Sequence, residues 1–353
     1  MAKILKVGIV GCGGVVKHRH LPAYNKMKRK VTVPAICDMN ESLAKETAST
    51  YHIPGAHASL TQMLAAEKLD IVDICTPPQT HAPLAVEALE HGCHVLIEKP
   101  MALKASECDR MIEAARKNGR KICVDHNVLF HPPFLKAKEL LAKGSIGTFT
   151  GMRIFMSDHR DKFALREDFW VHKLPGGLLG ESGPHAAYMS LAMLNKINGV
   201  DIVARSFLEH PWAQFDEFRI ELDGENGTSS IFISDTSNRH HCQVDIYGTE
   251  GALHLDLNSM LLHYQGRRDS LKPVDLARYS LGTAWRTVAG VAGNALKVVT
   301  GSTRLGLEVI IDRFIDSIVQ DSQPPVTGEE GRDTVRIMEM IVSKLHEKYG
   351  TAK

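Results

Sequence analysis

The sequence predicts a two-domain α/β protein, with a parallel sheet in the first part of the chain and a mixed or antiparallel sheet in the second. Over the first 125 residues, strand-like apolar runs alternate with helical patterns, as crossovers between parallel strands require. After about residue 127, strand-like runs follow one another with few helices between them. A chain of 353 residues is too long to fold around one hydrophobic core, so we expect two domains, at 1–126 and 127–353.

The first domain contains predicted strands that are apolar on both faces, which is typical of a parallel sheet covered by helices. These strands are Lys6–Val10, Val31–Cys37, Ile71–Cys75, Cys93–Ile97 and Lys121–Val124. The helical patterns between them are Glu41–Tyr51, Thr61–Glu67, His81–His91 and Ser106–Lys117. Ser59 is placed to cap the second of these helices.

The second domain has six predicted strands: Thr148–Met156, Ile202–Leu208, Glu217–Leu222, Thr228–Ser234, Gln243–Tyr247 and Ala252–Leu257. A helix opens at Pro132 and Pro133, a second is expected near Gly183–Asn195, and Leu307–Gln320 and Glu329–Lys348 close the chain. The Gly/Ala-rich segment from Arg267 to Arg304 fits a surface helix or a loop. It also fits a flap over an active site or a contact between protomers.

Composition narrows the class of protein. Charged residues make up 24% and the net charge is +1, so we expect no nucleic-acid partner. The chain shows no signal-peptide layout and no apolar run of about 18 residues, so we expect no membrane partner. The cysteines number seven, with no CxxC pair, which predicts a reducing cytoplasmic location and no metal site.

A glycine turn follows the first strand. Gly11 permits a tight turn, and Gly13 lets the backbone approach a pyrophosphate at a helix N-terminus. Val16 stands at the third glycine position of the fingerprint and is expected to push the helix off the strand. Asp38 ends the second strand, where its carboxylate can accept hydrogen bonds from ribose hydroxyls. No Arg follows Asp38 to bind a 2′-phosphate, so the sequence favours NAD over NADP. The alternative interpretation is a simple glycine turn and an aspartate that caps a helix.

The strongest chemical signal is Glu98-Lys99-Pro100. Lys99 is placed at the carboxyl edge of a parallel sheet, where open α/β folds bind ligands, and Pro100 prevents the strand from continuing. We expect a cis bond between Lys99 and Pro100. Thr76-Pro77 and His81 follow the central strand; they form a rigid turn with a capping residue, the floor of a dinucleotide crevice, or both.

A second informative run spans residues 174–185 and is rich in glycine, which lets the backbone bend close to a ligand. If a helix begins near Gly183, Glu181 and His185 flank its first turn and can share a face. Histidine is the natural proton donor or acceptor near neutral pH. Among the other histidines, His172 beside Trp170 is the second choice.

These motifs together resemble the Gfo/Idh/MocA oxidoreductases, a family that includes glucose–fructose oxidoreductase and inositol dehydrogenase. The resemblance covers nearly the whole chain. It rests on GCGG at 11–14, TPPQTH at 76–81, the run ending in EKPMA at 88–102, DHNVLFHPPF at 125–134, GSIG at 144–147, the glycine run ending in GPH at 176–185, IYGTEGAL at 246–253 and PPVTGEEGR at 324–332.

The resemblance implies a Rossmann domain followed by an α/β domain with a large open, mostly antiparallel sheet that packs against a partner protomer in homodimers or homotetramers. It implies hydride transfer between NAD(P) and a sugar, polyol or related alcohol. Lys99 matches the lysine that binds the reacting oxygen, and His185 matches the acid/base histidine. Glu181 stands where the family motif has Asp, so we count it as catalytic.

The expected cofactor-binding residues are Gly11, Gly13, Gly14, Val15, Asp38, Thr76, Pro77, His81, Glu98, Lys99 and Asn127. Trp170 and His172 are the expected substrate contacts. Two other functions share this fold. One is a glycosidase or lyase that retains NAD and gives no net NADH, and the other is a regulatory protein that binds the dinucleotide without turnover.

Overall fold

The computed structural model describes residues 3–158, 167–237, 239–266, 272–300 and 304–350. The chain divides into two compact units. The first contains Met1–Asn127 and Gly306–Glu339, and the second contains Val128–Leu305 and Met340–Lys353. The first division lies one residue from the boundary expected from the sequence. The return of Gly306–Glu339 to the first unit was not expected.

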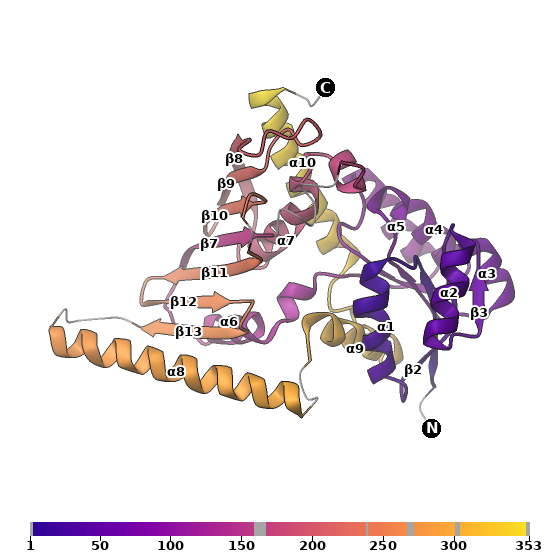
Figure 1. The fold of residues 1–353 in the computed structure, drawn as a ribbon, viewed down its shortest axis with the longest axis horizontal. Helices are drawn as coiled ribbons and strands as arrows, with labels where there is room; N and C mark the ends of the chain where they lie inside the picture. Colours follow the sequence, from indigo (N-terminus) through magenta and orange to yellow (C-terminus); the bar gives the residue numbers. More distant parts are fainter. Residues whose placement is uncertain (1–2, 159–166, 238, 267–271, 301–303, 351–353) are drawn as a thin grey trace. The chain divides into compact units, whose positions relative to one another are not determined.

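The first unit is built on a parallel sheet in the order β3-β2-β1-β4-β5-β6, the order of a Rossmann fold (Figure 1). Its strands are β1 (Leu5–Val10), β2 (Val31–Cys37), β3 (Gly55–His57), β4 (Ile71–Ile74), β5 (His94–Ile97) and β6 (Ile122–Val124). The central strands are buried on both faces, as their mostly apolar sequences predicted. The sequence missed β3, because three residues at a sheet edge leave no apolar run.

Helices connect these strands: η1 (Val16–His20), α1 (Leu21–Lys26), α2 (Glu41–Tyr51), α3 (Leu60–Ala66), η2 (Pro78–Thr80), α4 (His81–Glu90) and α5 (Ala105–Lys117). The side chain of Asn40 caps α2 by accepting from Leu43 N, and Ser59 caps α3 as expected by accepting from Gln62 N. Val16, which replaces the third glycine of the fingerprint, is fully buried and begins a turn of π-helix before α1. The helix after the glycine turn is therefore irregular at this position.

Two C-terminal helices complete the first unit: α9 (Gly306–Val319) and the first part of α10 (Gly328–Tyr349). Figure 1 shows α9 beside α1. Lys30 Nζ lies 2.6 Å from Asp312 and 2.7 Å from Asp316 on α9. At Gly331 on α10, a Cβ atom would stand 2.6 Å from Val124, so the helix approaches β6 closely. These contacts explain why a late segment belongs to the first unit.

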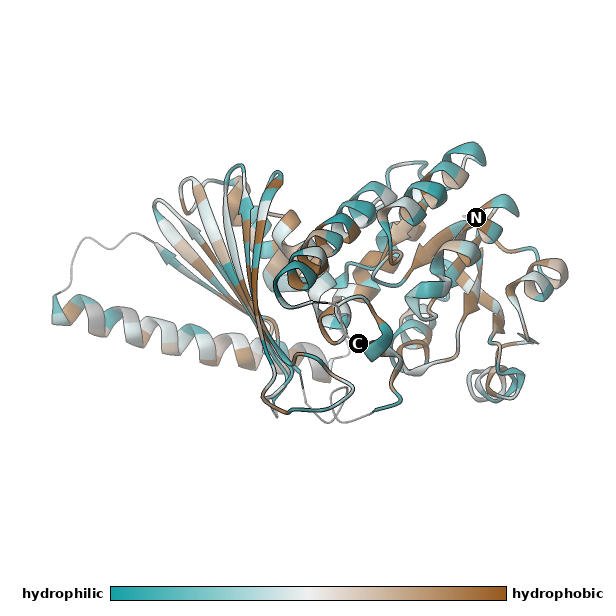
Figure 2. Cartoon of the chain, turned by 90° about the horizontal axis from the view of Figure 1, so that it is seen from above, coloured by the Kyte–Doolittle hydropathy of each residue, from teal (hydrophilic) through white to brown (hydrophobic). Residues whose placement is uncertain are grey.

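The second unit contains a mostly antiparallel sheet in the order β13-β12-β11-β7-β10-β9-β8, in which only the described pair β7–β10 is parallel. Its strands are β7 (Phe149–Ser157), β8 (Ile197–Arg205), β9 (Glu217–Gly224), β10 (Gly227–Ser234), β11 (His241–Gly248), β12 (Gly251–Asp256) and β13 (Leu261–Gly266). The sequence missed β13. Buried and exposed side chains alternate along β9, and Figure 2 shows polar and apolar residues alternating along these strands.

The helical elements of this unit are α6 (Pro132–Ala142), η4 (Trp170–Lys173), α7 (Leu179–Leu191) and α8 (Pro273–Val299), with η3 (Asn127–Phe130) at the junction of the units. α6 contacts β12 and β13, and α7 contacts β7 and β10. The segment with two open interpretations, Arg267 to Arg304, contains one helix of 27 residues, α8. Its ends, 267–271 and 301–303, lie outside the described residues.

Candidate active site

The glycine turn lies at the carboxyl edge of the first sheet. Gly11 has a φ of +101°, and a Cβ atom there would stand 2.8 Å from the carbonyl oxygen of Cys75, so only glycine fits. Gly13 is different, since a Cβ atom there would meet no heavy atom within 4 Å. The backbone at Gly13 therefore faces open space, as a turn that receives a pyrophosphate requires.

Asp38 is fixed beside this turn. One carboxylate oxygen accepts from Cys12 N at 2.8 Å, and the other accepts from Asn40 N at 2.8 Å. The carboxylate thus connects the end of β2 to the glycine turn after β1. This is the position from which an acidic side chain binds the adenosine ribose in Rossmann folds, so the residues fit a dinucleotide.

The turn after β4 is tied to the EKP segment by His81. Its ring nitrogens lie 2.8 Å from Thr76 O and 2.9 Å from Pro100 O. The side chain is fully buried, and burial lowers the pKa of His81. Because a neutral ring carries one N–H, it donates to one of the two carbonyls at a time. The predicted cofactor contact His81 is therefore engaged with the backbone of two loops.

The Lys99–Pro100 bond is cis, as the sequence predicted. Lys99 is half-buried directly after β5, and its backbone N–H donates to the carboxylate of Glu98 at 3.2 Å. Asn127, another predicted cofactor contact, donates its side-chain amide to Asp125 at 2.9 Å. The first unit therefore brings the glycine turn, Asp38, Lys99 and Asn127 to the carboxyl ends of neighbouring parallel strands.

A buried polar cluster lies beneath this edge, and the sequence analysis missed it. His20 Nδ1 lies 2.7 Å from Asp73, and its Nε2 lies 3.0 Å from Glu98. Tyr24 donates to Asp73 at 2.9 Å. The one available signal was a charged residue, Asp73, within an otherwise apolar strand.

The charges in this cluster are set by its neighbours. Burial opposes protonation of His20, but the carboxylate of Asp73 outweighs it and raises the pKa of His20 well above its usual value. Burial would raise the pKa of Glu98, but hydrogen bonding and charge from His20 and the charge of Lys99 lower it. Burial and Glu98 raise the pKa of Asp125. An imidazolium therefore lies between two carboxylates, with a neutral carboxylic acid beside Glu98.

Metal ligation is the other interpretation of this cluster. Among the described residues, His20 with Asp73 and Cys75, and His20 with Glu98 and Asp125, are spaced closely enough to hold an ion. Both ring nitrogens of His20 already have carboxylate partners within 3.0 Å. We therefore interpret the cluster as a hydrogen-bonded charge network.

In the second unit, Glu181 and His185 lie on α7, four residues apart and on one face. The helix begins at Leu179, four residues before the expected start, so Glu181 lies in its first turn and His185 in its second. His185 Nδ1 lies 2.6 Å from the hydroxyl of Tyr188, and the two rings meet edge to face. Tyr188, which is buried, was not foreseen and fixes the orientation of the imidazole.

An acidic group near Glu181 was also missed. Asp235 follows β10, is almost fully buried, and has a carboxylate oxygen with no hydrogen-bond partner. Burial, followed by the charges of Asp158, Glu217, Asp216 and Glu181, raises its pKa to about 8. Asp235 thus carries a proton at neutral pH in the electrostatic neighbourhood of Glu181. Its signal in the sequence was an acid at the end of an apolar strand.

Trp170 and His172 lie on the short helix η4, which leads towards the glycine run before α7. Both side chains are half-buried, and Trp170 packs against Phe169 with ring centroids 5.8 Å apart. Residues 159–166, which precede these two predicted substrate contacts in the sequence, lie outside the described residues.

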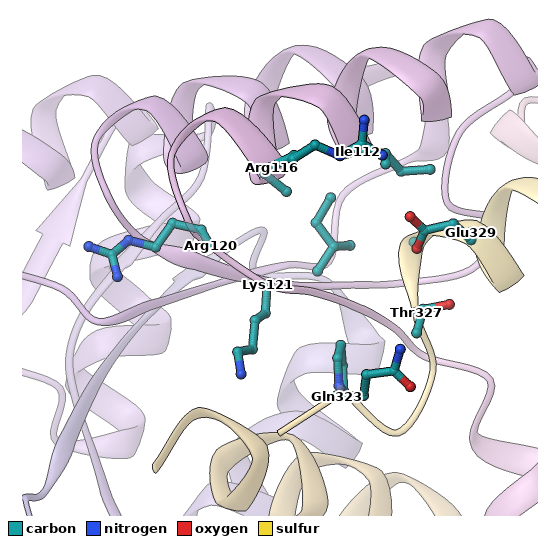
Figure 3. A pocket seen from close by; sticks show the side chains of 11 residues that line it. Ile112, Arg116, Arg120, Lys121, Gln323, Thr327 and Glu329 are labelled. Carbon is teal, nitrogen blue, oxygen red and sulfur yellow. The ribbon is translucent and has the colours of Figure 1, made fainter. Parts of the chain in front are cut away.

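A pocket on the first unit lies elsewhere (Figure 3). It is lined by Arg116, Arg120 and Lys121 from the end of α5 and the start of β6, and by Thr327 and Glu329 from the region where α10 begins. Since this is the amino end of β6, the pocket is at the opposite edge of the sheet from the glycine turn and Lys99. Open α/β sheets bind their ligands at the other edge, so we do not assign it to the active site.

The parallel sheet, the glycine turn and the carboxylate of Asp38 define a dinucleotide-binding Rossmann fold. The model of an oxidoreductase family with an NAD-binding Rossmann fold matches residues 5–126, and the C-terminal domain model of the same family matches residues 134–254. The chain belongs to the Gfo/Idh/MocA family.

Curated relatives include the uncharacterised oxidoreductase YrbE of Bacillus subtilis, 27% identical over 72% of this chain and 75% of its own length. D-apiose dehydrogenase of Paraburkholderia graminis is 25% identical over 96% of this chain and 86% of its own length. Among solved structures, the WlbA dehydrogenase of Bordetella pertussis, in complex with NADH and UDP-GlcNAcA, has a TM-score of 0.81 and 18% identity. That match covers 98% of this chain and 96% of the other, and it extends the likeness in fold to both units.

Proposed function

We propose that this protein is an NAD-dependent dehydrogenase that transfers a hydride between the nicotinamide and an alcohol carbon of a sugar, polyol or sugar derivative. The observation that carries the proposal is Lys99, half-buried after β5 at the edge where the sheet binds its cofactor, in a backbone held at both sides by Glu98 and His81. The substrate class is supported by relatives named for such substrates, among them D-apiose dehydrogenase and the D-glucoside 3-dehydrogenase of Escherichia coli.

The cofactor is held by the first unit. The backbone of Gly11, Gly13, Gly14 and Val15 binds the pyrophosphate, and Asp38 accepts from the ribose hydroxyls. Thr76, Pro77, Glu98 and Asn127 complete the site along the strand ends. The bound nicotinamide supplies the hydride acceptor or donor.

Oxidation of an alcohol to a carbonyl compound also removes the hydroxyl proton. The ammonium group of Lys99 stabilises the negative charge that develops on the reacting oxygen. The imidazole of His185 takes the proton, and Tyr188 orients that ring through its 2.6 Å hydrogen bond. The carboxylate of Glu181, one helical turn before His185, stabilises the positive charge that His185 acquires with the proton. In the reverse direction, His185 returns the proton.

The test uses purified protein with NAD and a panel of sugars, inositols and sugar acids, followed by NADH absorbance. With an accepted substrate, Lys99→Ala and His185→Ala each lower kcat by about a hundredfold or more, while the Kd for NAD changes little. Wild-type turnover in both variants would show that these residues are wrongly assigned. Tightly retained NAD with no NADH formed from any alcohol, together with conversion of a glycoside, would favour the retaining glycosidase or lyase.

We further propose a cytoplasmic homodimer or homotetramer formed through the outer face of the second sheet. The described cysteines are all free thiols, which suits a reducing compartment. The outer face carries aromatic groups beside charges: the ring of Phe232 lies tilted against the ring of Phe155, and the guanidinium of Arg219 lies over the ring of Phe232. Sedimentation velocity tests the assembly, and Phe232→Glu is expected to dissociate it. An unchanged sedimentation coefficient in that variant would exclude this interface.

A further inference from the structure

The helix α8 contacts its sheet through its polar and small residues, whereas an ordinary surface helix packs its apolar face against the protein. Thr287 lies 3.5 Å from His263 on β13, and the amide of Asn294 donates to the carbonyl of Met260 at 3.2 Å. Between them, Gly290 is so close to the sheet that a Cβ atom would stand 2.6 Å from Leu261. Polar and small side chains therefore form the contact with the protein.

The large apolar side chains of α8 point the other way. Trp285 is 72% exposed, Leu281 is 71% exposed and Val299 is 85% exposed. Val274, Val288 and Leu296 are also mostly exposed. Positions 281, 285, 288, 292 and 299 lie along one stripe of the helix. The inward-facing residues are Thr283, Thr287, Gly290 and Asn294. Because this second set is shifted by two residues, which is about half a helical turn, the two sets lie on opposite faces. An apolar stripe of this length on the outside indicates a binding surface.

The charge around this helix identifies what the stripe meets. Residues 267–304 contain seven Lys or Arg and two Asp, a net charge of +5. Because the whole chain carries +1, the remaining residues carry −4. Basic residues flank the helix on both sides in sequence, and Arg278 and Arg286 lie within it, both exposed. In the sequence, positive charge is thus concentrated in the segment that carries the exposed apolar stripe.

Pairing of two α8 helices from two copies of the chain is a poor fit to this surface, because two segments of +5 would repel each other. An anionic bilayer satisfies both features. Its acyl boundary receives the Leu, Val and Trp side chains, and its phosphates attract the flanking Lys and Arg. Among the described residues, no helix is long and apolar enough to cross a membrane. The apolar stripe along one exposed face of α8 suits a helix that lies in the membrane plane.

We propose that α8 binds the protein peripherally to membranes that contain anionic lipid, with the stripe Leu281, Trp285, Val288, Leu296 and Val299 in the interface. The helix has 27 residues, which gives a contact about 40 Å long. Figure 1 shows the ribbon of α8 running along the β13 edge of the sheet and continuing beyond it, and the side chains of the stripe are exposed. The expectation of no membrane partner came from the lack of a spanning segment, which an interfacial helix does not need.

The experiment is flotation of the full-length protein with vesicles of phosphatidylcholine, with and without phosphatidylglycerol. We expect the protein to float with the anionic vesicles and to be released by high salt. The double variant Leu281→Ser/Trp285→Ser is expected to bind them about tenfold more weakly, and Arg278→Glu/Arg286→Glu is expected to weaken binding similarly. The matched control is Phe207→Ser, an exposed apolar residue outside α8, which leaves binding unchanged.

Tryptophan emission gives a second readout. Anionic vesicles shift the emission of the wild-type protein to shorter wavelength, and Trp285→Phe abolishes the shift while circular dichroism and NAD binding stay unchanged. The proposal is overturned if wild-type protein fails to float, or if Phe207→Ser weakens binding as much as the α8 variant. It is also overturned if, without vesicles, Leu281→Ser/Trp285→Ser converts an oligomer to a monomer, which would make α8 a contact between copies.

Discussion

Replacing His20 with leucine tests the charge network under the active-site edge. In the folded protein, His20 is completely buried and is bonded to Asp73 at 2.7 Å and to Glu98 at 3.0 Å. His20→Leu keeps most of the volume but leaves two buried carboxylates without their cation. Breaking a buried ion pair on one side costs about 3–5 kcal/mol. At about 2–4 °C per kcal/mol for a domain of this size, the first unit should melt about 6–20 °C lower.

The pH dependence follows from the raised pKa of His20. A cation whose pKa is higher in the folded state contributes fully below its unfolded value of about 6.5, and this contribution is lost as pH rises through the folded value. Because the folded pKa is well above the unfolded one, the contribution persists at neutral pH and declines only in alkaline buffer. The gap in Tm between wild type and His20→Leu should therefore narrow as the pH is raised.

Scanning calorimetry with and without NAD measures this effect, since the cofactor marks the transition of the first unit. The matched control is His18→Leu, because His18 is exposed on the same helical turn. We expect it to change Tm by less than a tenth of the His20 effect. If the two variants melt together, or if the gap widens in alkaline buffer, the imidazolium between two carboxylates is refuted.

Three further predictions concern other groups. Asp235→Asn should stabilise the protein at pH 8 and not near pH 4, because burying a carboxyl group with its pKa raised to about 8 makes the fold less stable as the pH rises between these values. Thermal melts test this, with the exposed Asp223→Asn as the control. Asp38→Ser should weaken NAD binding about 10–100-fold in calorimetric titration, since a hydrogen bond to a charged group is lost, while affinity for NADP falls less. The seven thiols should react slowly with a disulfide reagent at pH 8 until the protein is unfolded, because burial raises the pKa of every one of them.

Local sequence was sufficient for the features set by local chemistry. The parallel sheet, the capping role of Ser59 and the cis bond before Pro100 all follow from residues within a few positions of one another, and the structure contains each. The family and its NAD-binding fold were also recognisable from motifs, and the family models match over both domains.

Long-range contacts were beyond this reasoning. His20 and Asp73 are 53 positions apart, and nothing near either residue indicates the other. The ion pairs of Lys30 with Asp312 and Asp316 join residues more than 280 positions apart, so the packing of α9 against the first unit could not be predicted from the sequence. In α8, glycine, alanine and valine are mixed in a pattern that fits neither a strand nor a strong helix, and only the tertiary contacts of Thr287 and Asn294 reveal which side faces inward.

The return of Gly306–Glu339 to the first unit has a consequence for biosynthesis. The Rossmann sheet leaves the ribosome early, but Lys30, Lys121 and the surface of β6 under Gly331 receive their partners only when the last part of the chain emerges. The nucleotide-binding unit therefore completes its folding after the second sheet has been synthesised. Chains that stop before residue 306 should expose that surface and be degraded or held by chaperones, and a chain of residues 1–126 alone is expected to be unstable for the same reason.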